Sequence, residues 1–524
     1  MHGERLILQL RYDRRATLAG RPIAPVSQGR STVESGYNSP DDLQDVRTSY
    51  KRVLQKYDES NYYSRYPLNS FWASTNMRDM RNIIESAASE VDVIHGAQRT
   101  FMFSVNVSDE VEQLAVDWLL EEQRTRDVDL SSFPGEVQES AHSYPPNNVL
   151  RQGRLLTPDF LRTVNISREI AAHVPTPPGK MRVIELGAGM GHLARTLRLL
   201  GLSRSHVIID IPETLVFSHC FLKKNFPDAK LLLVDDRTPA SSTLSDYDFV
   251  FVPALFADRV LDEQFDLFIN TASMGEMRNE VIRYWMDFIQ NRLSVKYLFT
   301  LNRYLNTLIP KEHAWRLEEN ECSLHYDLRW NILKWEVEPS FTRCPYVDTQ
   351  IARYVEIIGQ RLDAVDAEQC RQRAAALVRQ VKHEDWYRVL PTHPPVMTMR
   401  DGILVHNMTM SGTLFKLWEA LRLAPTAEAA AMMLRYLDTL LRDGDKELEE
   451  VPYYESLLLG LYDEARDQEL LEFANAMRRR QYSRLQAQAP REPERRALLG
   501  RVLSAVHRRI REYLGNRSEQ GSGS

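Results

Sequence analysis

Three glycines at alternate positions, Gly187, Gly189 and Gly191, stand between an apolar run and a stretch with a helical apolar stripe. Glycine lets the backbone turn tightly and approach a ligand closely, because it has no Cβ atom. Such a turn delivers the ligand to a helix N-terminus, where unpaired N–H groups favour a carboxylate or a phosphate. The spacing therefore predicts a ligand-binding turn; the alternative is a strand-to-helix turn that binds nothing.

Two acidic residues flank this turn at positions that suit a nucleoside ligand. Glu185 precedes the first glycine by two residues, and Asp210 ends the next apolar run, 19 residues after Gly191. An acid about 20 residues beyond such a turn, at the tip of the second strand, can accept hydrogen bonds from both hydroxyls of a ribose. The alternative role for Asp210 is a helix cap before Pro212.

The spacing of the glycines separates two classes of nucleoside cofactor. A dinucleotide turn has the pattern G-x-G-x-x-G, whereas here the pattern is G-x-G-x-G, with His192 where the third dinucleotide glycine would stand. This spacing and the preceding acid resemble motif I of the class I S-adenosylmethionine-dependent methyltransferases, whose loop faces the methionine part of the cofactor. The resemblance implies that the cofactor-binding residues are Glu185, Gly187, Ala188, Gly189, Gly191, His192, Asp210, Ile211 and Asn270.

A narrower resemblance extends over about residues 139–345. The chain is similar there to the sugar O-methyltransferase family, most specifically in Asp210-Ile211-Pro212-Glu213, in Ser273-Met274-Gly275-Glu276-Met277 and in Asn302-Arg303-Tyr304. That family implies transfer of a methyl group from S-adenosylmethionine to a hydroxyl of a sugar or glycoside, often on a bacterial polysaccharide or a natural product.

Methyl transfer to a sugar hydroxyl requires a closely positioned acceptor oxygen and a base, and several residues of the chain are candidates for these roles. The hydroxyl oxygen must lie about 3 Å from the methyl carbon, and a base helps because the hydroxyl is a weak acid. We expect Glu276 to be that base, with His313 as the histidine candidate; Glu276 could instead interact with a helix dipole. The residues expected to bind the acceptor are Ser273, Asn302, Arg303 and Tyr304. We expect no metal ion, because no ligand spacing compels one.

Two other functions stay open beside this one. The first is an S-adenosylmethionine-dependent methyltransferase whose acceptor is a non-sugar natural product or a peptide. The second is a catalytically silent methyltransferase-like scaffold whose C-terminal helices recruit partners. The intact glycines and Asp210 argue against the second.

The elements that position these residues follow from the apolar pattern. Short apolar runs alternate with helical stretches, and the runs are 182–186, 206–209, 230–234, 249–252, 265–269 and 296–301. This alternation indicates βαβ units and a mainly parallel sheet. Ligands of such sheets bind at the carboxyl ends of the strands, where the candidate residues fall. The pattern does not decide whether 230–234 or 249–252 is the third core strand.

We therefore predict an α/β fold: a Rossmann-like class I methyltransferase domain with a mainly helical N-terminal region and a helical C-terminal region. The expected division is a poorly ordered lead-in at 1–40, a helical N-terminal domain at 41–154, the Rossmann-like domain at 155–400, a helical C-terminal domain at 413–515 and a flexible tail at 516–524.

Composition limits the class of protein. The chain has 524 residues, 66 Lys and Arg against 72 Asp and Glu, and a net charge of −6, so we do not expect nucleic acid as a partner. No apolar run approaches the ~20 residues of a membrane helix, so we expect no membrane association. Four cysteines without CxxC spacing suit a reducing, cytoplasmic location. The helical regions could support a homo-oligomer.

Overall fold

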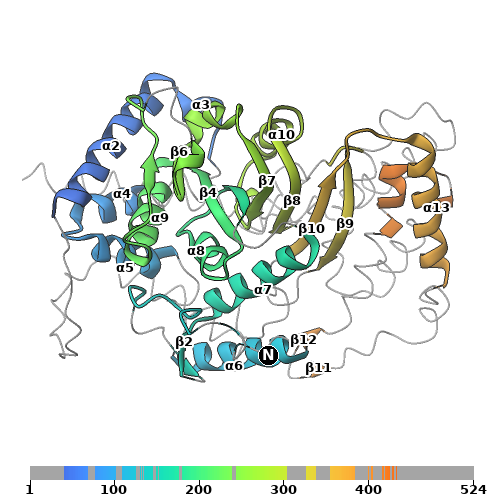
Figure 1. Ribbon diagram of the computed structural model, residues 1–524, viewed down its shortest axis with the longest axis horizontal. Helices are drawn as coiled ribbons and strands as arrows, with labels where there is room; N and C mark the ends of the chain where they lie inside the picture. Colours follow the sequence, from blue (N-terminus) through green and yellow to red (C-terminus); the bar gives the residue numbers. More distant parts are fainter. Residues whose placement is uncertain are drawn as a thin grey trace, which may run out of the picture.

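The structure is a computed structural model in which a central sheet carries helices on both faces (Figure 1). It describes residues 40–68, 77–101, 109–125, 130, 133, 135–144, 149–151, 153–175, 180–238, 244–303, 326–337, 354–383, 399–400, 403–404, 416–417, 419–424, 426, 428–429 and 432.

The helices before the sheet are α2 (Pro40–Glu59), α3 (Tyr62–Arg65), α4 (Met77–Ser86), α5 (Glu90–Phe101), α6 (Asp109–Thr125) and α7 (Pro158–His173). The later helices are α8 (His192–Leu199), α9 (Pro212–Asn225), η5 (Leu244–Asp246), η6 (Ala254–Val260), η7 (Met274–Glu276), α10 (Asn279–Asp287), η8 (Phe288–Arg292) and α13 (Ala367–His383). The strands of the main sheet are β3 (Met181–Leu186), β4 (Ser203–Asp210), β5 (Leu231–Leu233), β6 (Phe249–Pro253), β7 (Gln264–Thr271), β8 (Ser294–Arg303), β9 (Trp330–Val337) and β10 (Tyr354–Arg361). Two hairpins pair β1 (Val149–Arg151) with β2 (Arg154–Leu156) and β11 (Met399–Arg400) with β12 (Ile403–Leu404).

The main sheet has eight strands in the order β5-β6-β4-β3-β7-β8-β10-β9. The strands from β3 to β8 pair in parallel, whereas β10 is antiparallel to both of its neighbours. All six predicted runs are strands, which confirms the α/β prediction. Because β6 pairs with β4 and β5 lies beyond it, the run 249–252 is the third core strand. The sequence patterns did not predict β9 and β10.

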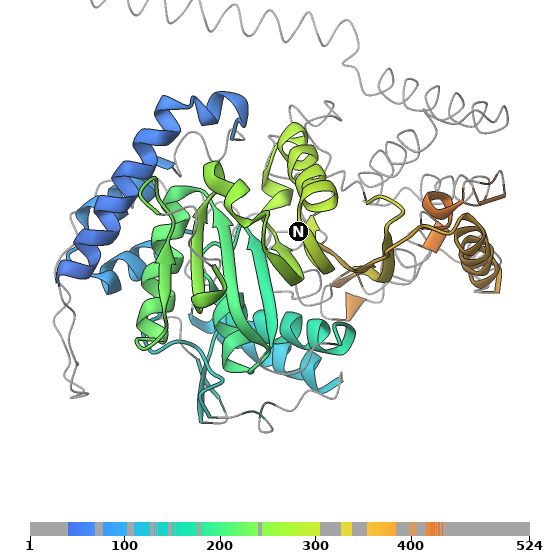
Figure 2. The same ribbon diagram turned by 45° about the horizontal axis from the view of Figure 1, so that its top comes forward.

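The strand order reverses at β3, which lies between β4 and β7. Figure 2 shows these strands side by side in the middle of the molecule. In doubly wound sheets, ligands bind outside the carboxyl ends of the strands at such a switch point. The predicted turn after β3 and the predicted acid at the end of β4 both lie at this edge.

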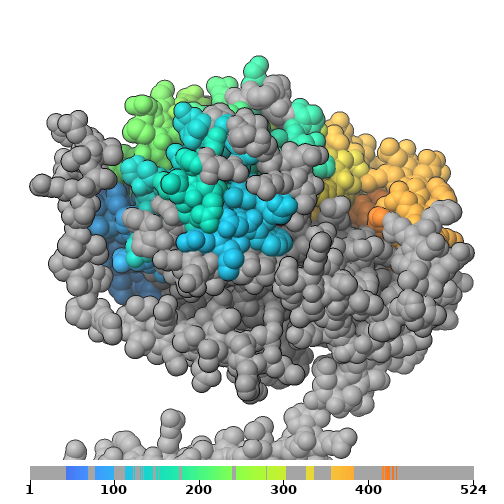
Figure 3. Space-filling view, turned by 90° about the horizontal axis from the view of Figure 1, so that it is seen from below, coloured from blue at the N-terminus to red at the C-terminus, as the bar shows by residue number. Residues whose placement is uncertain are grey.

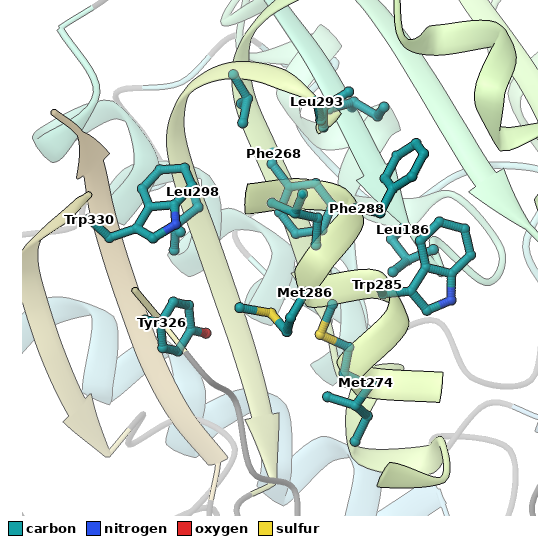
Figure 4. Packing of buried hydrophobic residues seen from close by; sticks show 14 of the residues in the cluster. Leu186, Phe268, Met274, Trp285, Met286, Phe288, Leu293, Leu298, Tyr326 and Trp330 are labelled. Carbon is teal, nitrogen blue, oxygen red and sulfur yellow. The ribbon is translucent and has the colours of Figure 1, made fainter. Parts of the chain in front are cut away.

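Side chains alternate between the two faces of the sheet and build a core on each. On one face, Val183 of β3 packs with Leu197 of α8, beside α7 and α9. On the other face, Ile184 packs in a cluster with Trp285 of α10 and Val378 of α13. Figure 4 shows the part of this cluster around Trp285 and Trp330.

The N-terminal helices pack against α9 and share its core. Tyr50 of α2, Met80 of α4 and Ile94 of α5 belong to the cluster that contains Phe251 of β6. Helices α2, α4 and α5 therefore share a core with the main sheet.

The first turns of the predicted C-terminal region also pack on the sheet. Leu417 and Leu421 belong to the cluster of Trp330. Buried Arg422 donates hydrogen bonds to the carbonyl oxygens of Asp327 and Trp330, at 2.6 and 2.9 Å. Leu417 and Leu421 therefore share a core with the sheet, and the predicted division of the chain into domains stays a prediction. Most of 413–515, together with 1–39 and 516–524, lies outside the described residues.

Helix α6 and the β1–β2 hairpin lie together on one face of the molecule (Figure 3). Arg151 of the hairpin pairs with Asp117 of α6 at 2.8 Å, and Leu119 packs in one cluster with Phe160 of α7. Helix α6 thus forms a second helical layer over α7. Within the described part of the chain, no helix combines the length and apolar character that crossing a membrane requires.

Candidate functional site

The turn after β3 has the left-handed backbone that its glycines predict. The φ angles of Gly187, Gly189 and Gly191 are 74°, 57° and 81°, a region that residues with a Cβ seldom adopt. A Cβ at Gly187 would lie 2.1 Å from Oγ of Ser273, and one at Gly191 would lie 3.2 Å from Leu222. A Cβ at Gly189 would meet no described atom within 4 Å. Gly187 and Gly191 are therefore needed for packing, while Gly189 faces open space at the switch point.

Asp210, at the end of β4, ties the turn to the neighbouring strand. Its Oδ2 accepts a hydrogen bond from the N–H of Gly189 at 3.2 Å, and its Oδ1 accepts one from the N–H of Ile211 at 2.8 Å. Burial raises the pKa of Asp210 to about 6, although hydrogen bonds from the Thr214 side chain and from these two N–H groups oppose the rise. A carboxylate has about four lone-pair sites, so it can accept hydrogen bonds from further donors such as a pair of hydroxyls.

Glu185 contacts protein rather than the open edge. Its Oε2 lies 2.8 Å from Nε2 of His206 on β4, and both side chains are buried. The pair connects β3 and β4 directly below the turn. Any effect of Glu185 on a bound cofactor is therefore indirect, through the strands that carry the turn.

A buried polar cluster lies at the start of α8, directly after the turn. Glu139 accepts hydrogen bonds from the N–H of Ser140 at 2.6 Å and from the hydroxyls of Ser143 at 2.9 Å and Thr157 at 2.6 Å. Nδ1 of His192 lies 3.9 Å from Oε1 of Glu139. Burial would raise the pKa of Glu139, but His192, Arg195 and the hydrogen bonds from Thr157 and Ser140 hold it below its usual range. The cluster fixes the first turn of α8 against the N-terminus of α7.

Two polar atoms beside the turn lack partners among the described residues. Nε2 of His192 is buried without a hydrogen bond, and burial lowers the pKa of this histidine. Oδ2 of Asp159, in the first turn of α7, is buried and unpaired as well, and its charge acts on His192. Buried polar groups in native proteins are generally paired with protein, water or ligand. The two atoms therefore suit a polar ligand group at the turn.

Asn270 and Asn302 form a buried amide network at the ends of β7 and β8. Nδ2 of Asn270 donates to the carbonyl oxygen of Leu186 at 2.7 Å and to Oγ of Ser273 at 2.6 Å. Its Oδ1 accepts from Nδ2 of Asn302 at 2.8 Å and from the N–H of Met274 at 3.3 Å. An amide side chain has two donor and two acceptor positions, and Asn270 fills all four with protein partners.

This network corrects the expected placement of both asparagines. They follow the predicted apolar runs 265–269 and 296–301, but they lie within strands, since β7 continues to Thr271 and β8 continues to Arg303. Their hydrogen bonds hold the carbonyl end of β3 and the turn that follows β7. We therefore interpret Asn270 and Asn302 as positioning residues.

The turn after β7 is fixed by the buried side chain of Met274 and by a hydrogen bond from Gly275, and Glu276 lies at its end. Ala272 has a φ of 62°, a strained value for a residue with a Cβ. Met274 is buried in the core beneath the turn (Figure 4), and the N–H of Gly275 donates to Oδ1 of Asn302 at 3.1 Å. Glu276, which is partly exposed, ends this turn at the carboxyl edge of the sheet. The predicted base and the glycine turn are thus brought to the same edge.

Two further predicted cofactor residues, Ala188 and Ile211, lie in the turn and at the start of α9. The carbonyl oxygen of Ala188 accepts a hydrogen bond from the N–H of Gly191 at 2.9 Å, inside the turn. Ile211 is the N-cap residue of α9. Tyr304 and His313 lie outside the described residues, as does the side chain of Arg303. In the described ranges, no group of three or more His, Cys, Asp or Glu could hold a metal ion, and the expectation of no metal stays a prediction.

Sequence reasoning did not assign Glu139 or Asp159 to the site. Thr157-Pro158-Asp159 is a helix-start pattern, and Thr157 does cap α7 by accepting a hydrogen bond from the N–H of Phe160. Nothing in the pattern says that this helix end lies against the glycine turn. That contact depends on how α7 packs on α8.

Comparison with known proteins gives structural similarities alone. No protein-family model and no curated protein matches the chain. The chain is similar to a putative methyltransferase, yhhF from Escherichia coli, with 11% identity, 39% of this chain and 86% of that chain covered, and a TM-score of 0.25. It is similar to M. capricolum TrmK in complex with S-adenosyl-homocysteine, with 9% identity, 41% and 86% covered, and a TM-score of 0.23.

A third solved structure is a dimethyladenosine transferase from Plasmodium falciparum, with 15% identity, 53% of this chain and 96% of that chain covered, and a TM-score of 0.23. These identities and TM-scores are too low to bear on the activity or substrate of this chain. The assignment of a mixed α/β, Rossmann-like fold rests on the strand order and on the turn after β3.

Proposed function

We propose that this chain is an S-adenosylmethionine-dependent methyltransferase that methylates a hydroxyl of a sugar or glycoside. One observation carries the proposal: the N–H of Gly189 and the carboxylate of Asp210 meet at the switch point of the sheet, beside open space. The acid suits two ribose hydroxyls, and the turn suits the amino-acid end of the same cofactor.

The residues around the turn fit that cofactor. Asp210 would hold the ribose, and the unpaired atoms of His192 and Asp159 would contact the amino and carboxylate groups of the methionine part. When bound, S-adenosylmethionine supplies an electrophilic methyl group on its sulfonium. Asn270 and Asn302 hold the strand ends around it by their buried network.

On the acceptor side, Glu276 is the proposed base. Its place at the edge of the sheet suits removal of a proton from an incoming hydroxyl. The choice of a sugar acceptor is supported by the resemblance of Ser273–Met277 and Asn302–Tyr304 to the sugar O-methyltransferase family. We propose a cytoplasmic location from the cysteine usage.

Transfer of a labelled methyl group from S-adenosylmethionine tests the proposal. The full chain is incubated with glycosides, with hydroxylated aglycones and with peptides, and the product is followed by mass. We expect methylated glycosides. Glu276→Gln should lower turnover by about 10²-fold with unchanged affinity for S-adenosylhomocysteine. Methylation of a peptide or an aglycone alone would contradict the sugar acceptor.

A further inference from the structure

A buried carboxylate–imidazole pair lies beneath the glycine turn, and no step of the proposed methyl transfer uses it. Oε2 of Glu185 on β3 lies 2.8 Å from Nε2 of His206 on β4, and the two side chains are 1% and 0% exposed. Burial removes both polar groups from water, which is costly. Apolar residues of similar volume often stabilise a core equally well or better. Stability alone therefore does not account for the pair.

The pair connects the two strands that carry the proposed cofactor site. Strands β3 and β4 lie side by side, with Glu185 opposite Ile208 in the parallel register (Figure 2). Because alternate residues of a strand share a face, Glu185, His206 and Asp210 lie on the same face of the sheet. Glu185 precedes Gly187 by two residues, and Asp210 ends β4 four residues after His206. The contact therefore joins the strands just before the turn and the acid.

The imidazole of His206 is held in one orientation. The backbone N–H of His206 donates to the carbonyl oxygen of Asp248, which precedes β6, at 2.9 Å. Nδ1 of the ring is buried and has no partner among the described residues. An ionised carboxylate only accepts hydrogen bonds, so Nε2 is the donor to Glu185. Within the described part of the chain, the polar contact of this ring is thus the one that holds Glu185.

The position of the turn depends on the strands that the pair connects. The N–H of Gly187 donates to the carbonyl oxygen of Ile209 at 2.8 Å, and the N–H of Gly189 donates to Asp210 at 3.2 Å. Both hydrogen bonds run from the turn to β4, directly beyond the buried pair. A shift of β3 against β4 would change both, and a binding site tolerates displacements of only about 0.5 Å.

We propose that His206 is a positioning residue of the cofactor site. Its Nε2–H holds the carboxylate of Glu185 inside the core, and this contact fixes the end of β3 against the end of β4. The proposal rests on the proposed function and deepens it, because it gives Glu185 an anchor on β4 in place of a contact with the cofactor.

Calorimetric titration of the full chain with S-adenosylhomocysteine tests the proposal on two substitutions of the same residue. The amide nitrogen of His206→Gln lies about where Nε2 lies and can donate to Glu185, whereas that of His206→Asn is too short to reach it. We expect His206→Gln to keep the wild-type affinity within about twofold. His206→Asn should bind about tenfold more weakly, because it loses a hydrogen bond to a charged group. A structural role alone would not make affinity depend on the reach of the amide.

Val207→Ala is the control on the same strand. Val207 is buried in the cluster on the other face of the sheet and does not contact the pair's face. Its truncation should lower stability in urea and leave the affinity for S-adenosylhomocysteine unchanged. Loss of affinity in Val207→Ala equal to that in His206→Asn would overturn the proposal, because affinity would then follow the stability of β4.

Wild-type affinity in a His206→Asn variant that unfolds cooperatively would overturn the proposal as well, and so would equal weakening in His206→Gln. Should His206→Asn fail to fold, the double variant Glu185→Met, His206→Leu decides, because an apolar pair often keeps a core stable. It should bind about tenfold more weakly, and wild-type affinity in it would contradict the proposal. A wild type that does not bind S-adenosylhomocysteine would contradict the proposed function itself, and this inference with it.

Discussion

Gly187 and Gly189 share a left-handed backbone but differ in their surroundings. At Gly187 the space for a side chain is filled by Ser273, which is itself bonded to Asn270. At Gly189 the space is open and the N–H points to Asp210. One glycine is thus needed for packing between two turns, and the other for access of a ligand to the backbone.

Gly187→Ala should destabilise the protein by about 3 kcal/mol, from left-handed strain and overpacking against Ser273. Gly189→Ala is the control, with a loss of about 1 kcal/mol from strain alone. Urea unfolding measures both, and Ser273→Gly added to Gly187→Ala should recover part of the loss. Equal losses in the two single variants would show that Ser273 does not fill the space.

The carboxyl group of Asp210 should make cofactor binding pH-dependent. Its pKa is about 6 because of burial, so the group is protonated below pH 6 and ionised above it. An ionised carboxylate accepts hydrogen bonds from two hydroxyls more strongly than a protonated one. Affinity for S-adenosylhomocysteine should therefore be constant above about pH 7 and fall as the pH drops through 6. Titrations from pH 5 to 8 measure this, and Asp210→Asn should remove the dependence.

At the scale of elements, the strands and the glycine turn could be predicted from the sequence. Apolar runs reveal buried parallel strands, and alternate glycines reveal the turn. The positioning role of Asn270 could not be predicted, since it depends on which carbonyl groups and amides the packing of β3, β7 and β8 brings together. Strands β9 and β10 could not be predicted because charged residues such as Lys334 and Glu356 interrupt their apolar pattern. In the structure, Lys334 of β9 and Glu356 of β10 form an ion pair.

Asn302→Ala should weaken both stability and cofactor binding. The change leaves the N–H of Gly275 without its partner and removes one of the two hydrogen bonds that Oδ1 of Asn270 accepts. A buried unpaired group costs about 1–3 kcal/mol. Because the network holds the end of β3, affinity for S-adenosylhomocysteine should fall about tenfold.

Thr300→Val is the matched control on the same strand. Thr300 bonds the hydroxyl of Tyr326 at 2.6 Å, away from the turn. This variant should lose stability in urea but keep the affinity. Unchanged affinity in Asn302→Ala would mean that the network has a structural role alone.

At the scale of the whole molecule, regions that differ in sequence pattern share hydrophobic cores. The helical periodicity of apolar residues in 41–154 predicts helices. It does not show that Tyr50 or Ile94 packs with the sheet. Likewise, the pattern after 413 does not show that Arg422 binds carbonyl groups of 326–330. Shared cores depend on contacts between distant parts of the chain, which local periodicity does not contain.

Two truncations should therefore behave differently. Ending the chain after Met410 removes Leu417, Leu421 and Arg422 and exposes the core beside Trp330. Ending it after Met432 keeps these contacts. We expect the shorter chain to lose its cooperative thermal transition or to melt at least 10 °C lower; the longer one should retain binding of S-adenosylhomocysteine. Equal melting of the two chains would contradict this role of Leu417, Leu421 and Arg422.

The central claim is that the turn after β3 and Asp210 form a cofactor site. Calorimetric titration of S-adenosylhomocysteine into the wild type and into Asp210→Ala tests it most directly. We predict one site per chain in the wild type and affinity at least 30-fold weaker in the variant, because loss of a charged acceptor costs about 2–4 kcal/mol. Absence of binding to the folded wild type, or equal affinity in the two proteins, would contradict the claim.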